Sequence, residues 1–141
     1  MNIVEFNIDR HYPTLCRYWE AHGWIPCPID ALPKHGRVAE RIDGYILAFM
    51  AIYIESGTIA VIDWALADPD APGDETHLAL QELFAALVEL ARSHGCHYVY
   101  SFTKNKGWGR RLESYGMLVA EKEATTYVMP LANTDTAFIR D

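Results

Sequence analysis

Apolar positions along this chain recur with two periods, one of about 3.6 residues and one of about two. The longer period is clearest over 74–94, where Leu, Phe, Val and Ala share one broad face, and it predicts a long amphipathic helix that ends at Gly95. The same period over 11–22 predicts a second helix, with Asp9 as its N-cap and Gly23 at its end.

Runs rich in Ile, Val, Tyr and Ala predict the strands. The strongest hairpin signal between them is the Asp43-Gly44 turn. A long helix between two strands requires a crossover, so strands 58–67 and 97–103 must be parallel or splayed apart. The predicted strands are 3–7, 37–42, 45–54, 58–67, 97–103, 117–123 and 126–131, and shorter helical segments are predicted within 28–35 and at 106–115.

This order of elements predicts one mixed α/β domain over 1–131, β-α-α-β-β-β-α-β-α-β-β with a splayed central strand pair, and a loose tail at 132–141. A chain of 141 residues is long enough for one buried core. The net charge of −7 argues against broad, sequence-independent binding of nucleic acid. No apolar run reaches membrane-spanning length and the first residues lack a basic start, so a cytoplasmic protein is expected.

The three cysteines are odd in number and widely spaced. Because no Cys-x-x-Cys pair exists, neither a disulfide framework nor a structural zinc site is expected, and no histidine pair has the spacing of a helical zinc site. We therefore expect no metal, and we expect Cys16, Cys27 and Cys96 to be buried free thiols.

Asp63 interrupts an otherwise apolar strand, beside Trp64. Strict alternation would place it on one face with Val61 and Ala65, and would place Trp64 and Leu66 on the opposite face. A carboxylate on an apolar face is costly unless it is paired or hydrated. Asp63 therefore either faces a wet cleft as a general base or pairs with a basic residue of a neighbouring strand, and the sequence leaves both alternatives open.

Several short motifs accompany this order of elements: Leu32-Pro33-Lys34-x-Gly36, the Asp43-Gly44 turn, Ile62-Asp63-Trp64, Asn105, and Leu112-Glu113-Ser114-Tyr115-Gly116-Met117. With them the chain resembles, over 3–131, the GNAT superfamily of N-acyltransferases, and most closely its small phage-encoded members. The resemblance implies a GNAT fold and an acyl-CoA donor, acetyl-CoA or a related thioester.

In that superfamily a strand splays from its neighbour at a bulge, and the pantetheine arm of coenzyme A pairs with the exposed backbone, here at Ala65, Leu66 and Ala67. The N–H of Leu66 or Ala67 would stabilise the oxyanion of the thioester. Asp63, directly or through water, would deprotonate a primary amine that attacks without a covalent intermediate. The resemblance leaves open whether that amine belongs to a small molecule, a protein or a modified nucleobase, and strand 126–131 offers an edge for a homodimer.

The phosphate loop departs from the family pattern of Arg/Gln-x-x-Gly-x-Gly/Ala. Pro72 takes the Arg/Gln position and donates no N–H, while Glu75 and His77 take the glycine positions. The acids around them would repel a pyrophosphate. The loop either still binds phosphate, with Gly73 among its contacts, or serves only to start the helix with Asp74 as N-cap.

A second departure concerns the acid that protonates the leaving thiolate. Leu112 occupies the family's Tyr position, and Tyr115, one helical turn further, either substitutes for it or packs in the core. The four basic residues within 104–111 either bind the phosphates of coenzyme A or a nucleic-acid backbone, or form a solvated surface. The predicted site is Asp63 and Tyr115 for catalysis and, for the cofactor, Ala65, Leu66, Ala67, Gly73, Asn105, Arg110 and Arg111. The alternative to an enzyme is a degenerate GNAT-fold module, phage-encoded, that binds or inhibits a partner without catalysis.

Overall fold

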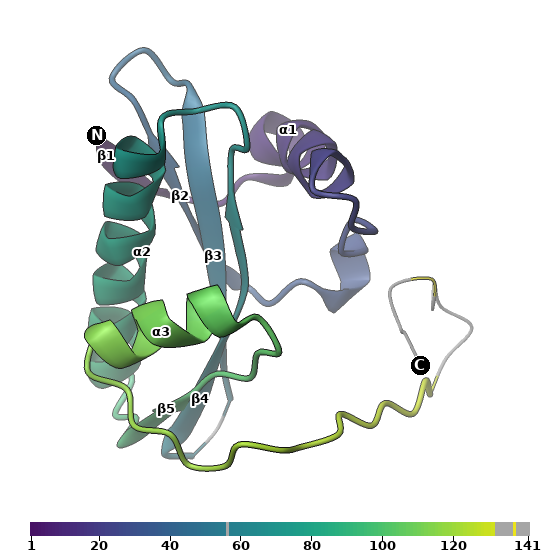
Figure 1. Cartoon of the computed structure of the whole chain (residues 1–141), viewed down its shortest axis with the longest axis vertical. Coiled ribbons are helices and arrows are strands. Elements are labelled where there is room, and N and C mark those ends of the chain that lie inside the picture. The colour runs from purple at the N-terminus through teal and green to yellow at the C-terminus, as the bar shows by residue number, and fades with distance from the viewer. Residues whose placement is uncertain (56, 132–136, 138–141) are drawn as a thin grey trace. The chain divides into compact units, whose positions relative to one another are not determined.

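The computed structural model describes residues 1–55, 57–131 and 137. The chain divides into two compact units, Met1–Ser101 and Phe102–Asp141. The first unit holds the β-sheet and the two longest helices, and the described part of the second holds one short helix (Figure 1). Among the residues described, no helix is long and apolar enough to cross a membrane.

The sheet of the first unit has five strands in the order β1-β2-β3-β4-β5 (Figure 1). Neighbours are antiparallel from β1 to β4, and β4 and β5 are parallel across the helix that connects them. The hairpin turn at Asp43-Gly44 is confirmed: Gly44 has a φ of 90° and donates its N–H to the carbonyl of Arg41. The strands are β1 (Asn2–Glu5), β2 (His35–Glu40), β3 (Ile46–Ile54), β4 (Ile59–Ala67) and β5 (Tyr98–Tyr100).

The two long helices confirm the predicted amphipathic segments, but their caps differ from the prediction. Helix α1 (Ile8–Ala21) begins one turn earlier because the side chain of Asn7, not Asp9, accepts the N–H of Arg10 at 2.9 Å. Helix α2 (Gly73–Ser93) begins after Pro72 with no side-chain cap, so Asp74 lies in its first turn and is not the N-cap. The predicted helical turn after α1 is the short helix η1 (Ile29–Ala31).

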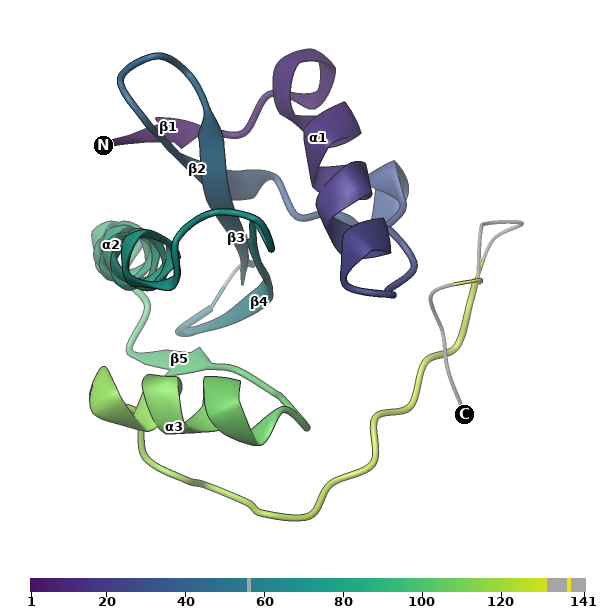
Figure 2. The same ribbon diagram turned by 45° about the horizontal axis from the view of Figure 1, so that its top comes forward.

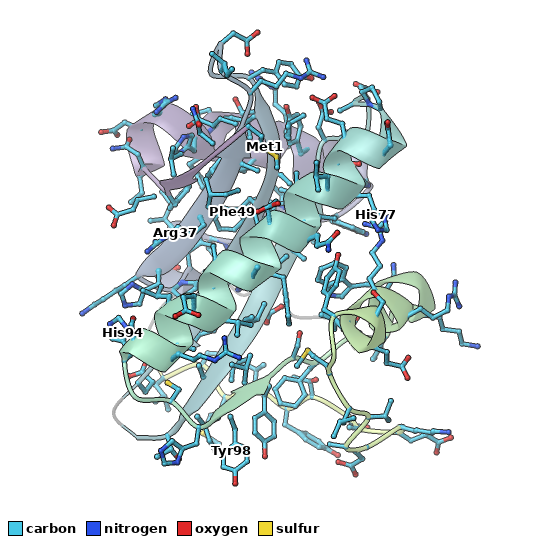
Figure 3. All side chains as sticks on the ribbon, turned by 90° about the vertical axis from the view of Figure 1, so that its left-hand side faces the viewer. Met1, Arg37, Phe49, His77, His94 and Tyr98 are labelled. Atoms are coloured by element: carbon cyan, nitrogen blue, oxygen red, sulfur yellow. The ribbon has the colours of Figure 1, made fainter. Side chains whose placement is uncertain are left out.

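The two helices cover opposite faces of the sheet (Figure 2). Leu15 and Trp19 of α1 pack in one buried cluster with Val38, Phe49 and Leu66 of the strands. Helix α2 lies across the other face, with His77 near its first turn and His94 at its end (Figure 3). This helix buries its apolar face there through Thr76, Ala79, Leu80, Leu83, Phe84, Leu87 and Ala91.

The predicted closing strands 117–123 and 126–131 are not formed; α3 (Lys106–Ser114) is the one regular element in the described part of the second unit. These segments have strand-like composition, but a strand is stable only when it pairs and buries one face. Here Leu118, Tyr127 and Met129 are instead 80 to 93% exposed. Strand β5 also stops at Tyr100, three residues short of its predicted end. The predicted tail at 132–141 lies, apart from residue 137, outside the described residues.

Candidate active site at the β4 bulge

Strand β4 contains a β-bulge next to Asp63. Ala51 of β3 pairs with Asp63, while Phe49 pairs with Leu66, so two residues of β4 face one residue of β3. The first of these, Trp64, has a φ of 61°, the left-handed conformation that non-glycine residues rarely adopt. Its N–H donates to the carboxylate of Asp63 at 2.7 Å. The acid predicted from the sequence therefore lies at the start of the bulge and helps to hold it.

The bulge changes which side chains share a face of the sheet. Ala51 and Phe49 are two residues apart and both pack on the α1 side, so their partners Asp63 and Leu66 lie on that side as well. Trp64 also points there, with its ring 6.4 Å from that of Trp19. The predicted alternation, which placed Trp64 and Leu66 opposite Asp63, is therefore wrong beyond Asp63, because it had no extra residue in the strand.

Beyond the bulge, one edge of β4 has no strand partner among the described residues. Strand β5 pairs with β4 from Ile59 to Val61 only, and the next inward-facing carbonyl, that of Ile62, accepts the hydroxyl of Ser101 at 3.0 Å. Strand β4 continues without this neighbour to Ala67. This register confirms the predicted separation of the strand pair.

The hydrogen bonds at the end of β4 fix the direction of the remaining N–H groups. The N–H of Asp68 donates to the carbonyl of Leu47 on β3 at 2.9 Å. Since successive N–H groups alternate between the two edges, Leu66 also faces β3, while Ala65 and Ala67 face the open edge. The open edge of β4 thus presents the backbone of Ala65 and Ala67, and the N–H of Leu66 lies within the sheet.

Polar groups around Asp63 are neutral and well bonded. Tyr53 donates its hydroxyl to the carbonyl of Ala31 at 2.8 Å and accepts the indole N–H of Trp64 at 2.7 Å. Burial, and then the charge of Asp63, raises the pKa of the Cys27 thiol to about 12, so this buried cysteine is no thiolate nucleophile at neutral pH. The three thiols are free, but Cys16 and Cys96 are half-buried, so their predicted full burial is wrong.

Asp63 itself is exposed, yet desolvation by the surrounding protein raises its pKa, and the Trp64 N–H bond opposes that rise. No ion pair involves Asp63 within the part of the chain that the structure describes. Of the two alternatives left by the sequence, pairing with a basic residue of a neighbouring strand is therefore not seen among the described residues, and the role of Asp63 as a general base stays a prediction. A carboxylate with a raised pKa is a better proton acceptor than an ordinary aspartate, which suits a general base.

His22 and Trp24 reach the same edge of β4 from the loop after α1. The imidazole Nε2 of His22 lies 2.9 Å from the carbonyl oxygen of Ala67, so this nitrogen carries the proton and donates. The ring of Trp24 stacks on His22 with centroids 4.5 Å apart. Sequence reasoning missed His22 because its partner is 45 residues away and no local pattern marks the contact.

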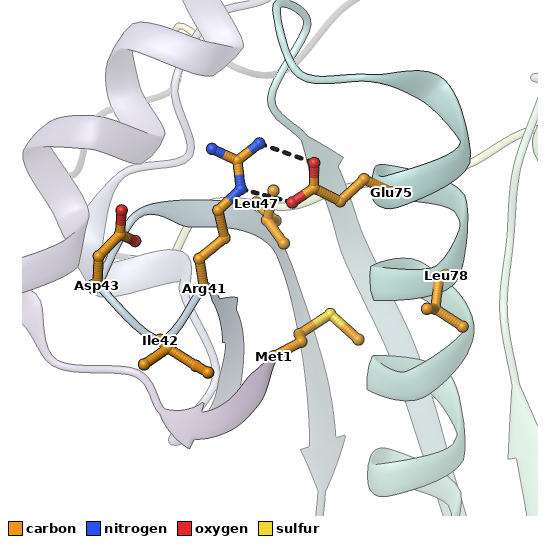
Figure 4. A pocket seen from close by; sticks show the side chains of 7 residues that line it. All are labelled: Met1, Arg41, Ile42, Asp43, Leu47, Glu75 and Leu78. Carbon is orange, nitrogen blue, oxygen red and sulfur yellow. Dashed lines mark hydrogen bonds and ion pairs between the residues drawn. The ribbon is translucent and has the colours of Figure 1, made fainter.

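Two of the acids around this loop, Asp68 and Glu75, have protein partners. The buried carboxylate of Asp68 accepts the hydroxyl of Tyr45 and, at 2.9 Å, the N–H of Asp70. Glu75 and Arg41 form a two-pronged ion pair, with Nη2 to Oε2 at 2.7 Å, which lowers the pKa of Glu75 (Figure 4). The pair borders a cavity of about 530 Å³ that is lined by Met1, Arg41, Ile42, Asp43, Leu47, Glu75 and Leu78.

The expected repulsion at the start of α2 is therefore partly offset by Arg41, a residue that the sequence did not single out. Gly73 starts α2 with open space around its Cα, so no neighbouring atom requires a glycine there.

The other predicted site residues belong to the second unit. Asn105 is the N-cap of α3 and accepts the N–H of Trp108 at 2.8 Å, while Arg110 and Arg111 lie on that helix. Tyr115 is its C-cap, with its ring 6.2 Å from that of Trp108, and burial raises the pKa of its hydroxyl. The first unit thus gathers Asp63 with Ala65, Leu66 and Ala67. Among the described residues, no group of three His, Cys, Asp or Glu side chains is placed to hold a metal ion.

Neither a protein-family model nor a curated protein matches the chain. Solved structures do match. An acetyltransferase from Trypanosoma brucei is 15% identical with a TM-score of 0.67, and 90% of this chain aligns to 99% of that one. Glucosamine-6-phosphate N-acetyltransferase from Arabidopsis thaliana is 14% identical with a TM-score of 0.68, over 89% of this chain and 97% of that one. The chain has the GNAT fold.

A third matching structure is a complex with a ligand. It is AAC(6')-Iy in complex with the bisubstrate analogue CoA-S-monomethyl-acetylneamine, 15% identical with a TM-score of 0.67, over 92% of this chain and 98% of that one. Identities this low establish a shared fold and leave the activity of this GNAT-fold chain to be argued from its own residues.

Proposed function

We propose that the protein is an N-acyltransferase that moves an acetyl or related acyl group from acyl-CoA to a primary amine by direct attack. The observation that carries this proposal is the open edge of β4, where the backbone of Ala65 and Ala67 lacks a described strand partner beside the exposed carboxylate of Asp63. An extended donor arm can pair with such an edge as an added strand would.

The donor would run along this edge. The N–H groups of Ala65 and Ala67 would bond its amide carbonyl and stabilise the thioester oxyanion, and the register favours these two over Leu66. Gly73, at the start of α2, would lie closest to the pyrophosphate, and Arg110 and Arg111 would supply cationic contacts. The coenzyme A analogue bound by AAC(6')-Iy, which shares the fold, supports this donor.

The chemistry would need three proton transfers. Asp63, directly or through a water molecule, would take a proton from the ammonium group, and the free amine would attack the thioester carbonyl. As the new C–N bond forms and the C–S bond breaks, the thiolate would take a proton from Tyr115 and leave as the free thiol of coenzyme A. The nitrogen would pass its extra proton through water to the tyrosinate, so that Tyr115 ends protonated. Burial keeps the hydroxyl of Tyr115 protonated until that step.

One observation favours a second candidate, a GNAT-fold binding module without catalysis. Pro72 lacks an N–H, and Glu75 stands at a family glycine position, where its ion pair with Arg41 fills space near the start of α2. If this pair cannot open, the pyrophosphate has no place to bind. A binding or inhibitory role, phage encoding and a homodimer stay predictions.

Calorimetry with acetyl-CoA separates the two candidates. We expect binding, weakened about tenfold or more when Arg110 and Arg111 are both changed to Ala, because each cationic phosphate contact is worth on the order of 1 kcal/mol. Lys122→Ala, a charge removed from an exposed site of the same unit, is the matched control and should leave binding unchanged. Absence of heat at millimolar acetyl-CoA would overturn the acyltransferase proposal and support the binding module.

A further inference from the structure

The segment from His22 to Ala31 borders β4 on both sides of the bulge. At one end His22 donates to the carbonyl of Ala67, and at the other Tyr53 joins the carbonyl of Ala31 to the indole of Trp64. This acceptor wall, residues 22–31, therefore lies alongside the part of β4 that carries Asp63.

The acceptor wall exposes an apolar surface. Trp24 is 40% exposed, Ile25 44% and Ile29 47%, although all three are large apolar side chains. Neighbouring exposed apolar residues of this kind commonly mark a binding surface. The indole of Trp24 is also held in place by its stacking on His22, so its face is preorganised for a flat or aliphatic group.

The charge of this region has one sign. Residues 22–33 and β4 contain no Lys or Arg, and their acids are Asp30 and Asp63. Both acids raise the pKa of Cys27, so their fields overlap at the acceptor wall. A carboxylate or phosphate on the acceptor would be repelled here, whereas an ammonium group would be attracted.

Resting on the proposed function, we infer that the acceptor is a cationic primary amine on an apolar or aromatic body, without an acidic group. Its ammonium group pairs with Asp63 and its body lies on Trp24, Ile25 and Ile29. Transfer of the acyl group converts the ammonium into a neutral amide. The product loses its attraction to Asp63, which favours its release.

Phenethylamine and L-phenylalanine form a matched pair of probes, because they share the ring and the amine and differ only by a carboxylate. Their binding to the protein is measured by NMR titration, with the indole N–H signal of Trp24 as reporter and without any donor. We expect phenethylamine to bind about tenfold more tightly, the effect of bringing a second carboxylate within ~6 Å of Asp63 in a partly hydrated site. Asp30→Asn should reduce this preference, and Asp9→Asn, at the opposite end of α1, should not.

Thiol release from acetyl-CoA is then measured with the same pair. Equal or tighter binding of L-phenylalanine, or an equal rate of acyl transfer to it, would overturn the inference while leaving the acyltransferase proposal intact. If phenethylamine binds preferentially but neither probe causes thiol release and acetyl-CoA does not bind, the acyltransferase proposal is overturned and the surface only binds cations. If phenethylamine both binds preferentially and is acylated preferentially, the acyltransferase proposal and the inference about its acceptor are both supported.

Discussion

Proline at position 67 would remove the one N–H that the strand register directs from Ala67 to the open edge of β4. Because that N–H takes no part in the β3–β4 ladder, Ala67→Pro deletes no hydrogen bond of the fold, and proline is tolerated at such edge positions. Leu66→Pro is the matched variant on the adjacent residue. It deletes an N–H that faces β3, and it also removes a side chain that is 1% exposed.

The two variants should differ strongly in stability. Ala67→Pro changes the backbone restriction alone and should cost about 1 kcal/mol. Leu66→Pro loses a ladder hydrogen bond, at ~3 kcal/mol, and part of the packing of a buried leucine, at ~2 kcal/mol more. With a urea m-value of about 2 kcal/mol/M, the unfolding midpoints should differ by roughly 2 M.

Urea unfolding followed by circular dichroism measures this difference, and calorimetry with acetyl-CoA measures donor binding by the folded Ala67→Pro protein. We expect that protein to be folded and to have lost donor binding, since both the N–H and the space beside it are taken. Equal destabilisation by the two prolines would show that Ala67 belongs to the ladder and would refute the register argument. Normal acetyl-CoA binding by folded Ala67→Pro would show that the donor does not use this edge.

Three further variants test the electrostatics. Burial raises the pKa of Asp63, so the folded protein loses stability as the pH rises from the pKa of Asp63 in the unfolded state to its pKa in the folded state. In urea titrations, Asp63→Asn should therefore be more stable than wild type at pH 7 and equal to it near pH ~3. The variant should also be inactive in thiol release. Arg41→Ala should return the lowered pKa of Glu75 to its ordinary range in carboxyl NMR titrations, and it should abolish the part of the acid-induced loss of stability that occurs as pH falls through that pKa. Glu40→Ala leaves the buried Nε2–H of His11 without its acceptor, now 2.9 Å away, and should cost about 3 kcal/mol in urea unfolding. A cost below ~1 kcal/mol would contradict a buried hydrogen bond from His11 to the Glu40 carboxylate.

The sequence was sufficient for those parts of the fold that depend on local pattern. The apolar period of 74–94 predicted α2 to within a residue at each end, and the Asp43-Gly44 turn predicted the hairpin between β2 and β3. The same reasoning overestimated strands at 117–123 and 126–131. Strand propensity describes a residue's fit to a pleated surface, and it does not state whether a neighbouring strand is present to provide that surface.

The bulge could not be predicted from the sequence pattern for a related reason. Strict alternation of faces assumes that no residue is inserted in the strand. It therefore assigned Asp63 to the correct face of the sheet but assigned every later side chain of β4 to the wrong face. Nothing in the local sequence marks Trp64 as left-handed. Its conformation is held by the adjacent Asp63 and by Tyr53 of β3 and Trp19 of α1, and the last two meet Trp64 only in the folded protein. Local sequence patterns also do not predict contacts between residues that are distant along the chain, such as Arg41 with Glu75.

The bulge also explains how one strand can serve two purposes. Without the extra residue, Ala65 and Ala67 would share the α1 face with Asp63 and Leu66 would point away, which would leave a gap in the cluster around Trp19 and Phe49. With it, the strand returns Leu66 to the core and keeps Asp63 on the same face, in solvent. Trp64 is the bulge residue between Asp63 and Leu66 and packs against this cluster. Replacing Trp64 with a small residue should therefore both destabilise the core and displace the carboxylate of Asp63. If only the stability or only the position of the carboxylate changed, core packing and the candidate site would be independent.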